Sequence, residues 1–303
     1  MCLTSSEKCG ILYVSETGFE ASMLNHIIGL NLDEERALYA LKDGLVEQCT
    51  FAGPADGESA LKEARNVTVR NCSFSLRYPF WHTEDFSVEH CTFDEGVRAP
   101  LWYAKRGSFS HCSFSGVKCL RECDSISFDH CEITSEEFGW RNRNIDLDRC
   151  DITAQYFLFE TKGGSLKNVT MKGKYSFQYT EDLTVENCDL DTKDAFWHSK
   201  NVTVKNCTVK GEYLGWYSEG LTLINCKIIG TQPLCYCKNL TLIDCTMEDT
   251  DLSFEYSHVN ATVLGHIDSV KNPASGRIVA DTVGEIILED SVMETNCEIV
   301  VKS

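Results

Sequence analysis

A nine-residue phrase returns about every nineteen residues through most of this 303-residue chain. It reads Asn-Val-Thr-Val-Arg-Asn-Cys-Ser-Phe at 66–74 and Asn-Val-Thr-Val-Lys-Asn-Cys-Thr-Val at 201–209. A fixed period of this length is typical of one supersecondary unit stacked on copies of itself, because each unit buries its apolar face only against its neighbours. The repeat therefore predicts one elongated body rather than two ordinary globular domains.

Each repeat alternates apolar and polar residues around a cysteine. Around Cys226, for example, the apolar positions are Leu221, Leu223 and Ile228, with a polar residue between the two leucines. Period-two alternation marks strands with one buried face. At about 3.3 Å per residue, nineteen residues make a closed path of about 60 Å, enough for three short strands with sharp corners. Coils stacked about 4.8 Å apart make every strand parallel to its successor, so we predict an all-β parallel β-helix of about 11–13 coils.

Two rival architectures fit the repeat less well. A left-handed β-helix needs hexapeptide turns and coils of eighteen residues, so the right-handed form is favoured. A leucine-rich repeat would show its Leu-x-x-Leu half and helical segments between the strands, and neither appears. Residues 33–42 read as a short capping helix with acids in the first turn. We therefore expect an N-terminal extension and cap over residues 1–42 and one β-helix domain over residues 43–303, irregular from residue 265.

The cysteine position is filled by cysteine in most coils and is expected to continue through Val169, Leu264 and Ser291. The position before it carries mainly Asn, His and Asp, a polar ladder whose side chains can satisfy backbone groups at a turn. Stacked cysteines hold their Cβ vectors parallel, a poor arrangement for the disulfide torsion of about 90°. We expect reduced, buried thiols that pack as small hydrophobes, and no metal site.

Charge and hydropathy limit the kinds of partner that this protein is expected to bind. With 46 acidic and 28 basic residues the net charge is −18, and such a surface repels nucleic acid and anionic membranes. No apolar stretch approaches the ~18 residues of a membrane span, and the first residues lack the pattern of a secretory signal. Seventeen cysteines would suggest disulfides in a small secreted protein, but because the chain shows no such signal we predict a cytoplasmic protein with reduced thiols.

Several local motifs resemble the pectin-lyase-like right-handed β-helix superfamily, and within it an uncharacterised, mostly bacterial family of unknown function. These motifs are Phe80-Trp81-His82-Thr83, Phe196-Trp197-His198-Ser199, Gly215-Trp216-Tyr217-Ser218 and Thr-Gln-Pro-Leu-Cys-Tyr-Cys at 231–237. The resemblance covers about residues 34–303 and implies the parallel β-helix, but it supplies no catalytic residues. Polygalacturonase-like enzymes would show Gly-His-Gly and Arg-Ile-Lys motifs, which Gly265-His266-Ile267 and Arg277-Ile278-Val279 match only in part.

Two neighbouring columns, ten and nine residues before the cysteine position, carry the candidate binding site. The first holds all five tryptophans, and the second is polar or aromatic and includes charged residues, so it is expected to face solvent. Another apolar column precedes the tryptophans, and two adjacent columns cannot both point inward on a regular strand, so one of these two is exposed. The sequence leaves open which one. The candidate ligand-binding residues are Trp81, His82, Trp102, Tyr103, Trp140, Tyr179, Trp197, Trp216, Tyr217 and Tyr236.

The polar column also contains the candidate catalytic residues. Glu122, Arg141 and Glu160 lie on three successive coils, which places the two glutamates about 10 Å apart at the backbone. Their side chains could reach the separation of the acid and base of an inverting glycosidase, and His198 is a candidate general base. The alternative is a salt-bridged stack in which Arg141 neutralises both glutamates and His198 is a surface residue.

Rows of aromatic and polar side chains suit an extended polymer or a sugar ring. The sequence therefore indicates a carbohydrate-binding or carbohydrate-active protein whose ligand is an oligosaccharide or a small neutral or amino sugar. If the protein is an enzyme, we expect a glycoside hydrolase or lyase without a cofactor. The alternative is a non-catalytic scaffold or self-associating protein that uses the exposed apolar stripe as a homo-oligomer interface.

Overall fold

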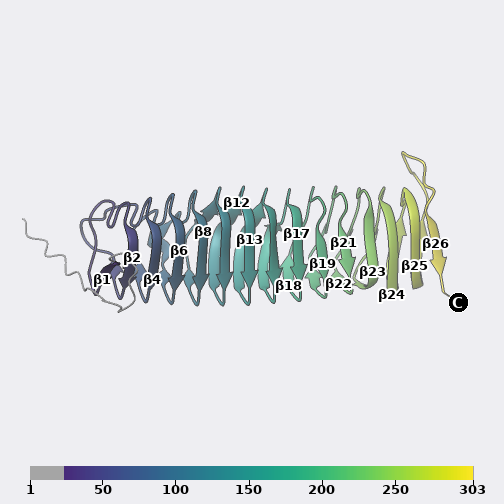
Figure 1. The fold of residues 1–303 in the computed structure, drawn as a ribbon. Helices are drawn as coiled ribbons and strands as arrows, with labels where there is room; N and C mark the ends of the chain where they lie inside the picture. The colour runs from purple at the N-terminus through teal and green to yellow at the C-terminus, as the bar shows by residue number, and fades with distance from the viewer. Residues whose placement is uncertain (1–23, 303) are drawn as a thin grey trace, which may run out of the picture.

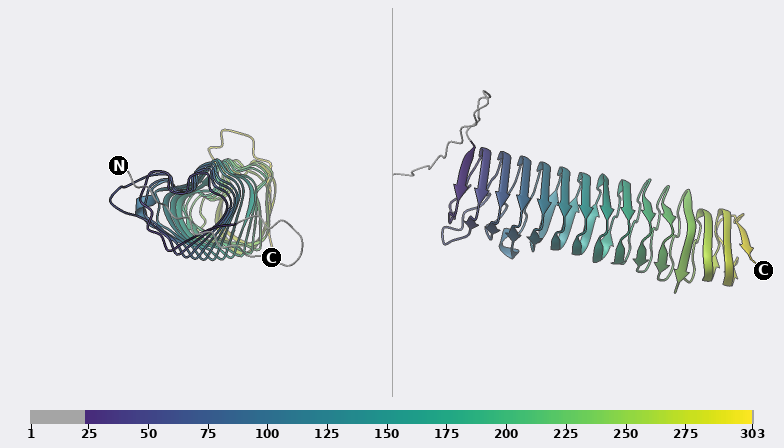
Figure 2. Two further views of the ribbon diagram at one scale, coloured as in Figure 1. Left: turned by 60° about the vertical axis from the view of Figure 1, so that its left-hand side comes forward. Right: turned by 60° about the horizontal axis from the view of Figure 1, so that its bottom comes forward.

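The computed structural model describes residues 24–302, which wind into one parallel β-solenoid of about 15 turns with a period of about 19 residues (Figure 1). The predicted all-β parallel β-helix is thereby confirmed, with more coils than the 11–13 expected. Two further views show the coils stacked on one another along the whole body (Figure 2). Within residues 24–302 there is no helical segment of the length and hydrophobicity that a membrane crossing requires.

The strands form two long parallel ladders, sheet A and sheet B, joined by a corner at the cysteine position. Sheet A contains β1 Asn25–Ile28, β2 Lys42–Glu47, β4 Arg65–Arg70, β6 Glu84–Glu89, β8 Lys105–Ser110, β11 Asp124–Asp129, β13 Arg143–Asp148, β15 Lys162–Lys167, β17 Glu181–Glu186, β19 Thr203–Lys205, β21 Thr222–Ile224, β23 Leu240–Glu248, β24 His258–Lys271, β25 Ser275–Ile287 and β26 Glu298–Val301. Sheet B contains β3 Thr50–Phe51, β5 Ser73–Phe74, β7 Thr92–Phe93, β9 Ser113–Phe114, β10 Lys118–Arg121, β12 Glu132–Trp140, β14 Asp151–Phe159, β16 Thr170–Ser176, β18 Asp189–Thr192, β20 Thr208–Lys210 and β22 Lys227–Ile229. Strand β23 also pairs with β22 of sheet B, and a short 3-10 helix, η1, spans Glu95–Val97.

The core is built from like residues stacked on like residues, because pairing in register places equivalent positions of successive coils above one another. Phe74 and Phe93 show this in sheet B, with ring centroids 4.7 Å apart and planes within 3°. Phe114 extends the same stack at 4.5 Å from Phe93. All three rings are at most 1% exposed. The hydrophobic core is therefore one continuous stack of side chains along the solenoid, which we call the apolar file, rather than a separate core in each coil.

Cysteines at the corner point into this file. The ten cysteines of the repeat position are at most 4% exposed, and no described cysteine forms a disulfide. Their thiols lie close to the carbonyl oxygen two residues earlier, as in Cys72 Sγ to Arg70 O at 3.1 Å. This bond satisfies a backbone group at the corner. Cys123 lies outside this column, between β10 and β11, and burial raises the pKa of its thiol to about 12.

The column does not continue through Leu264 and Ser291 as predicted. The register shifts by one residue after Leu242, so that Val263 pairs with Cys245, and Ala280 and Val301 follow in the next two coils. Leu264 is consequently 43% exposed, and Ser291 lies outside the strands. A shorter coil moved the inward position by one residue, which a fixed count of nineteen does not reveal.

The backbone conformation just before the cysteine position explains why polar residues form a ladder there. From Gln48 to Asp244 this residue has a φ between 49° and 55° in every coil. The left-handed region is unfavourable for most side chains but is tolerated by Asn, Asp and His. The amides also bond along the stack, as Asn225 Nδ2 donates to Asn206 Oδ1 at 2.9 Å. The sharp corner and the amide bonds thus account for the residue types at this position.

The capping helix predicted over residues 33–42 does not form. Arg36, Leu38 and Ala40 have φ values of 55°, 56° and 51°, whereas an α-helix needs about −63°. Their backbones bond the next coil instead, as Arg36 N–H donates to Glu58 O at 2.8 Å and Ala40 N–H to Lys62 O at 2.9 Å. The segment is an arc of the solenoid, which continues toward the N-terminus as β1. Residues 1–23 of the predicted extension lie outside the described residues.

Asp194 is the one charged side chain in the buried interior of residues 24–302, at 7% exposure. Its Oδ1 has no hydrogen-bond partner among the described residues. Burial raises the pKa of this carboxyl, against the opposing effect of Lys193 and Lys174. Because the unfolded chain then releases the proton at a lower pH than the folded protein does, this group reduces stability as pH rises through those pKa values.

We expect Asp194→Asn to raise the free energy of unfolding by about 1 kcal/mol at pH 7, since it removes a buried unpaired charge. Asparagine also tolerates the φ of 54° at this position. The gain should disappear below the ordinary aspartate pKa, where the wild-type carboxyl is protonated in both states. Thermal unfolding at both pH values measures this. Asp182→Asn, exposed and with a φ of 55°, is the matched control, and destabilisation by Asp194→Asn at pH 7 would contradict the prediction.

Candidate functional site

The column before the tryptophans is the one that points inward. Phe80, Leu101 and Leu120 are 0% exposed, whereas Trp81 and the residues in its column up to Trp216 are half-buried at the surface. Two consecutive residues can face outward here because the chain turns a corner: Phe80 and His82 both have left-handed backbones, with φ values of 62° and 57°. The next residue, Thr83, is again buried. Tryptophans and the polar column thus share one outer edge.

The tryptophan column mainly joins successive coils to one another. Trp81 and Trp102 stack with centroids 4.9 Å apart, Trp197 and Trp216 at 5.4 Å, and Trp140 lies 4.4 Å from Phe159. Stacking covers the ring faces that a ligand would need. Four indole N–H groups donate to backbone carbonyls of the next coil: Trp81 to Ala99 at 2.8 Å, Trp102 to Lys118 at 3.0 Å, Trp197 to Tyr213 at 2.6 Å and Trp216 to Gln232 at 2.7 Å.

The polar column contains two aromatic stacks separated by charged residues. His82 and Tyr103 form the first, with centroids 4.8 Å apart. The second, which we name the tyrosine–histidine stack, runs from the ring of residue 179 to that of residue 236. Its centroid separations are 4.8 Å from Tyr179 to His198, 5.0 Å to Tyr217 and 4.8 Å to Tyr236. Only the rings at the ends of such a stack keep a face that no other ring of the stack covers.

The structure does not bring the four candidate catalytic residues into one site. Arg141 Nε contacts Glu160 Oε2 at 2.8 Å, but Glu122 makes no ion pair with any described residue, so the salt-bridged alternative is realised only in half. The ring of Tyr179 lies on the coil between Glu160 and His198. Burial lowers the pKa of His198, which keeps its imidazole neutral at pH 7.

Three of the predicted residues, Arg141, Glu160 and Tyr179, do come together in an open depression of about 390 Å³. We name it the tyrosine depression. Its complete lining is Arg141, Asn142, Arg143, Glu160, Lys162, Tyr179 and Glu181.

Sequence reasoning missed the buried Asn142 and three charged residues, Arg143, Lys162 and Glu181. For the three charged residues the signal was present. Each follows a member of the polar column by two residues, and the residue between them is buried, as Thr161 is at 0% exposure. Residues two apart around a buried residue lie on the same face. Extending the polar column by two positions would therefore have found the other wall of the depression.

Charge in the tyrosine depression is paired and slightly positive. Arg141 binds Glu160, and Lys162 Nζ binds Glu181 Oε2, each at 2.8 Å. Arg143 makes no ion pair with a described residue, which leaves three cations against two carboxylates on a chain whose net charge is −18. The ring of Tyr179 is 45% exposed, with one face stacked on His198. The depression thus combines an aromatic surface with charged hydrogen-bonding groups.

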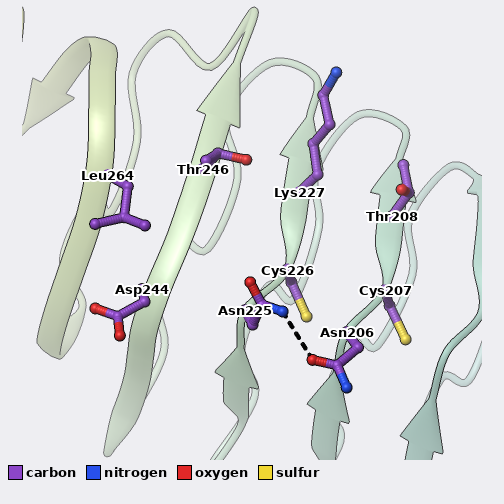
Figure 3. Close-up of a pocket in the computed structure, with 9 residues that line it drawn as sticks. All are labelled: Asn206, Cys207, Thr208, Asn225, Cys226, Lys227, Asp244, Thr246 and Leu264. Carbon is purple, nitrogen blue, oxygen red and sulfur yellow. Dashed lines mark hydrogen bonds between the residues drawn. The ribbon is translucent and has the colours of Figure 1, made fainter.

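A second, smaller depression of about 270 Å³ lies at the corner between the sheets (Figure 3). Figure 3 shows Asn206, Asn225 and Asp244 following one another along the polar ladder, with Leu264 on the neighbouring strand. No aromatic residue lines it, and the one large apolar side chain is Leu264. The complete lining is Asn206, Cys207, Thr208, Asn225, Cys226, Lys227, Asp244, Thr246 and Leu264.

Residues 24–302 contain no group of three or more His, Cys, Asp or Glu side chains placed to hold a metal ion. The Cys-x-Cys sequence at Cys235 and Cys237 is buried. Burial raises the pKa of these thiols to about 12 and about 11 respectively. Protonated thiols are poor metal ligands, because the thiolate is the form that binds.

Comparison with known proteins gives the following similarities. None of the curated proteins compared with the chain matches it. Among solved structures, the A-module of mannuronan C-5 epimerase AlgE6 from Azotobacter vinelandii is 10% identical with a TM-score of 0.36, over 88% of this chain and 81% of that one. The catalytic domain of a GH87 alpha-1,3-glucanase is 9% identical with a TM-score of 0.35, over 92% of this chain and 64% of that one. The surface protein and adhesin PfbA of Streptococcus pneumoniae is 8% identical with a TM-score of 0.27, over 85% and 91%.

Similarities of this size say nothing about shared ligands or shared site residues. The β-helix fold implied by the resemblance of the sequence to the pectin-lyase-like superfamily is confirmed, and the strand pairing itself is parallel throughout both sheets. A family model also matches nearly the whole described part of the chain. Residues 25–300 match the family described as "Protein of unknown function (DUF3737)", and the chain belongs to that family.

Proposed function

We propose that this protein binds a saccharide in the tyrosine depression. The observation that carries the proposal is the convergence of Tyr179 with two carboxylates and three cationic side chains in one open depression. Sugars present apolar C–H faces that pack on aromatic rings, and hydroxyls that bond carboxylates, amides and guanidinium groups. The lining of the depression offers both kinds of contact.

Much of the depression is ordered before a ligand arrives. The pairs Arg141–Glu160 and Lys162–Glu181 join successive coils at 2.8 Å, and His198 holds one face of the Tyr179 ring. Side chains already held in place lose less conformational entropy on binding. Glu160 and Glu181 each keep acceptor capacity beyond one ion-pair partner, which suits the hydroxyls of a neutral sugar or the ammonium group of an amino sugar. The net charge of −18 on the chain disfavours a polyanionic ligand.

The proposal concerns binding and not catalysis. Glu160 is ion-paired with Arg141, and Glu122 and His198 do not line the depression. Glu122 and Glu160 therefore do not face a common ligand position, as the acid and base of an inverting glycosidase must. The catalytic roles of Glu122, Arg141, Glu160 and His198 stay predictions from the sequence.

Removal of the aromatic ring tests the proposal. We expect Tyr179→Ala to weaken binding of a neutral or amino oligosaccharide by about ten-fold, the effect of losing about 1.4 kcal/mol of aromatic contact. Isothermal titration calorimetry against a panel of such oligosaccharides measures the dissociation constants of the wild type and the variant.

Tyr217→Ala is the matched control, because Tyr217 is 46% exposed in the same tyrosine–histidine stack but does not line the depression. This variant should bind nearly as tightly as the wild type. Two results would refute the proposal: no binding of any neutral or amino oligosaccharide by the wild type, or an equal loss of affinity in both variants.

A further inference from the structure

The C-terminal end of the solenoid presents an open strand edge. Strand β26, Glu298–Val301, pairs with β25 and with no other described strand. Val301 is 46% exposed, whereas Ala280, its partner in the previous coil, is 0% exposed. The inner apolar file therefore reaches the surface at this end. Unpaired edges of this kind readily accept a further strand, and natural proteins usually blunt them.

The edge is longer than β26 itself. Strand β25 continues from Asp281 to Ile287 beyond its pairing with β26, so this part lacks a described partner on the outer side. Ile286 is 44% exposed and Leu288, just after the strand, is 58% exposed. In Figure 1 both strands lie at the extreme C-terminal end of the body.

At the other end, β1, Asn25–Ile28, pairs with β2 and with no other strand of residues 24–302. Ile28 is 52% exposed and Leu30 is 47% exposed. Both ends of the described solenoid thus expose aliphatic side chains beside a strand with one free edge.

The two ends also match in register. Pairing in sheet A connects Ile27 to Val46 at the N-terminal end and Ile278 to Ile299 at the C-terminal end, and both pairs belong to one inward column that runs through the sheet. His26 and Glu298 belong in the same way to one outward column. Laying β1 of a second copy on β26 in this register would place Ile27 over Ile299 and the His26 imidazole beside the Glu298 carboxylate.

We propose that a second copy of this chain docks head-to-tail on the C-terminal end, with its β1 paired in parallel to β26. Apolar side chains meet apolar side chains in this arrangement. Glu298 binds Arg277 at 3.1 Å and His26 binds Glu47 at 3.0 Å within their own chains, so basic and acidic side chains would alternate across the junction and no like charges are opposed. The docked strand continues the sheet and supplies partners to the free backbone groups of β26. The two contacting surfaces differ, and the docked copy continues the axis of an elongated body, so the contact repeats without closing into a ring and produces linear assemblies that grow with concentration.

Charge substitutions at the two ends test this arrangement with full-length protein. Ile27→Lys places a charge on the inward column of the N-terminal surface, and Val301→Lys does the same at the C-terminal surface. Ile27 is half-buried and Val301 is 46% exposed, and each lies on a terminal strand, so the fold should tolerate the change. Val117→Lys, at a position 40% exposed in the middle of the body, is the control. Sedimentation velocity over a wide range of concentrations reads the assembly state, and circular dichroism verifies that each variant is folded.

We expect the wild type and Val117→Lys to form assemblies of increasing length, and each end variant alone to be monomeric. An equimolar mixture of the two end variants should form dimers and nothing larger, because it contains one intact pair of surfaces. A wild type that stays monomeric at every concentration overturns the proposal. Loss of assembly in Val301→Lys but not in Ile27→Lys also overturns it, because that result would indicate contact between two C-terminal ends. Loss in Val117→Lys would indicate a lateral contact and overturns it as well.

Discussion

Replacing Phe93 with alanine is expected to lower the free energy of unfolding by about 3–5 kcal/mol. Phe93 is 1% exposed and lies between two parallel rings, 4.7 Å from Phe74 and 4.5 Å from Phe114. The substitution removes both aromatic contacts and leaves a cavity between strands whose positions are set by coils on either side. Because the coils are held in register above and below, the structure cannot collapse to fill the space, so we expect the upper part of that range.

Equilibrium denaturation in urea measures this effect. Phe159→Ala is the control, because Phe159 is also aromatic and its ring lies 4.4 Å from that of Trp140, but it is only half-buried. This substitution should lower the free energy of unfolding clearly less than Phe93→Ala does. Each coil contacts only its neighbours, so a weak coil should also broaden the unfolding transition or divide it in two. A single sharp transition with a loss below about 1 kcal/mol would show that the aromatic file does not hold the coils together.

Most of the fold could be predicted because each inward position is repeated in many coils. Val185, Val204 and Leu223 pair directly across three strands, so the same apolar signal is read again at each repeat and single exceptions have little weight. Prediction failed at the ends, where there is no further repeat to average over. Acids at the start of residues 33–42 imitate the first turn of a helix, but the backbone bonds available from the coil at Glu58 and Lys62 determine its conformation.

The candidate site was predicted less completely, for a geometric reason. Alternation of inward and outward residues assumes an extended strand, whereas the arc at Phe80, Trp81 and His82 has left-handed residues on both sides of the tryptophan. Two consecutive side chains then face outward, which the pattern of a regular strand cannot express. The row of tryptophans could be found from the sequence, but the stacking that covers their faces depends on ring orientations that no sequence pattern encodes.

The same regularity limits what the surface can do. Aromatic residues on successive coils stack, and opposite charges on successive coils form ion pairs, as in Arg141–Glu160 and Lys162–Glu181. Both arrangements stabilise the body but occupy the groups that would bind a ligand. A site is expected where a ladder is interrupted, and the tyrosine depression lies where the aromatic column changes to Glu160 and Arg141. That interruption, rather than the number of aromatic residues, distinguishes this part of the surface from the rest of the polar column.

The second large effect is expected at adjacent glycines in one strand. Gly164→Ala should lower the free energy of unfolding by at least about 3 kcal/mol, because its left-handed φ of 115° and a steric clash act together. A Cβ at this position would collide with the carbonyl oxygen of Ile145, the paired residue in the previous coil. Backbone on a paired strand cannot move away without breaking the ladder that joins β13 and β15.

Gly163→Ala provides the matched comparison one residue earlier. Its φ of 73° is also left-handed, but the nearest atom to an added Cβ is Asn144 Oδ1 at 2.8 Å, the end of a side chain that can rotate away. We therefore expect only the backbone penalty, about 1–2 kcal/mol. Thermal and urea denaturation of the two variants compare the costs directly. If they proved equal, contact with Ile145 would contribute nothing, and the close approach of successive coils could not be the reason for glycine at position 164.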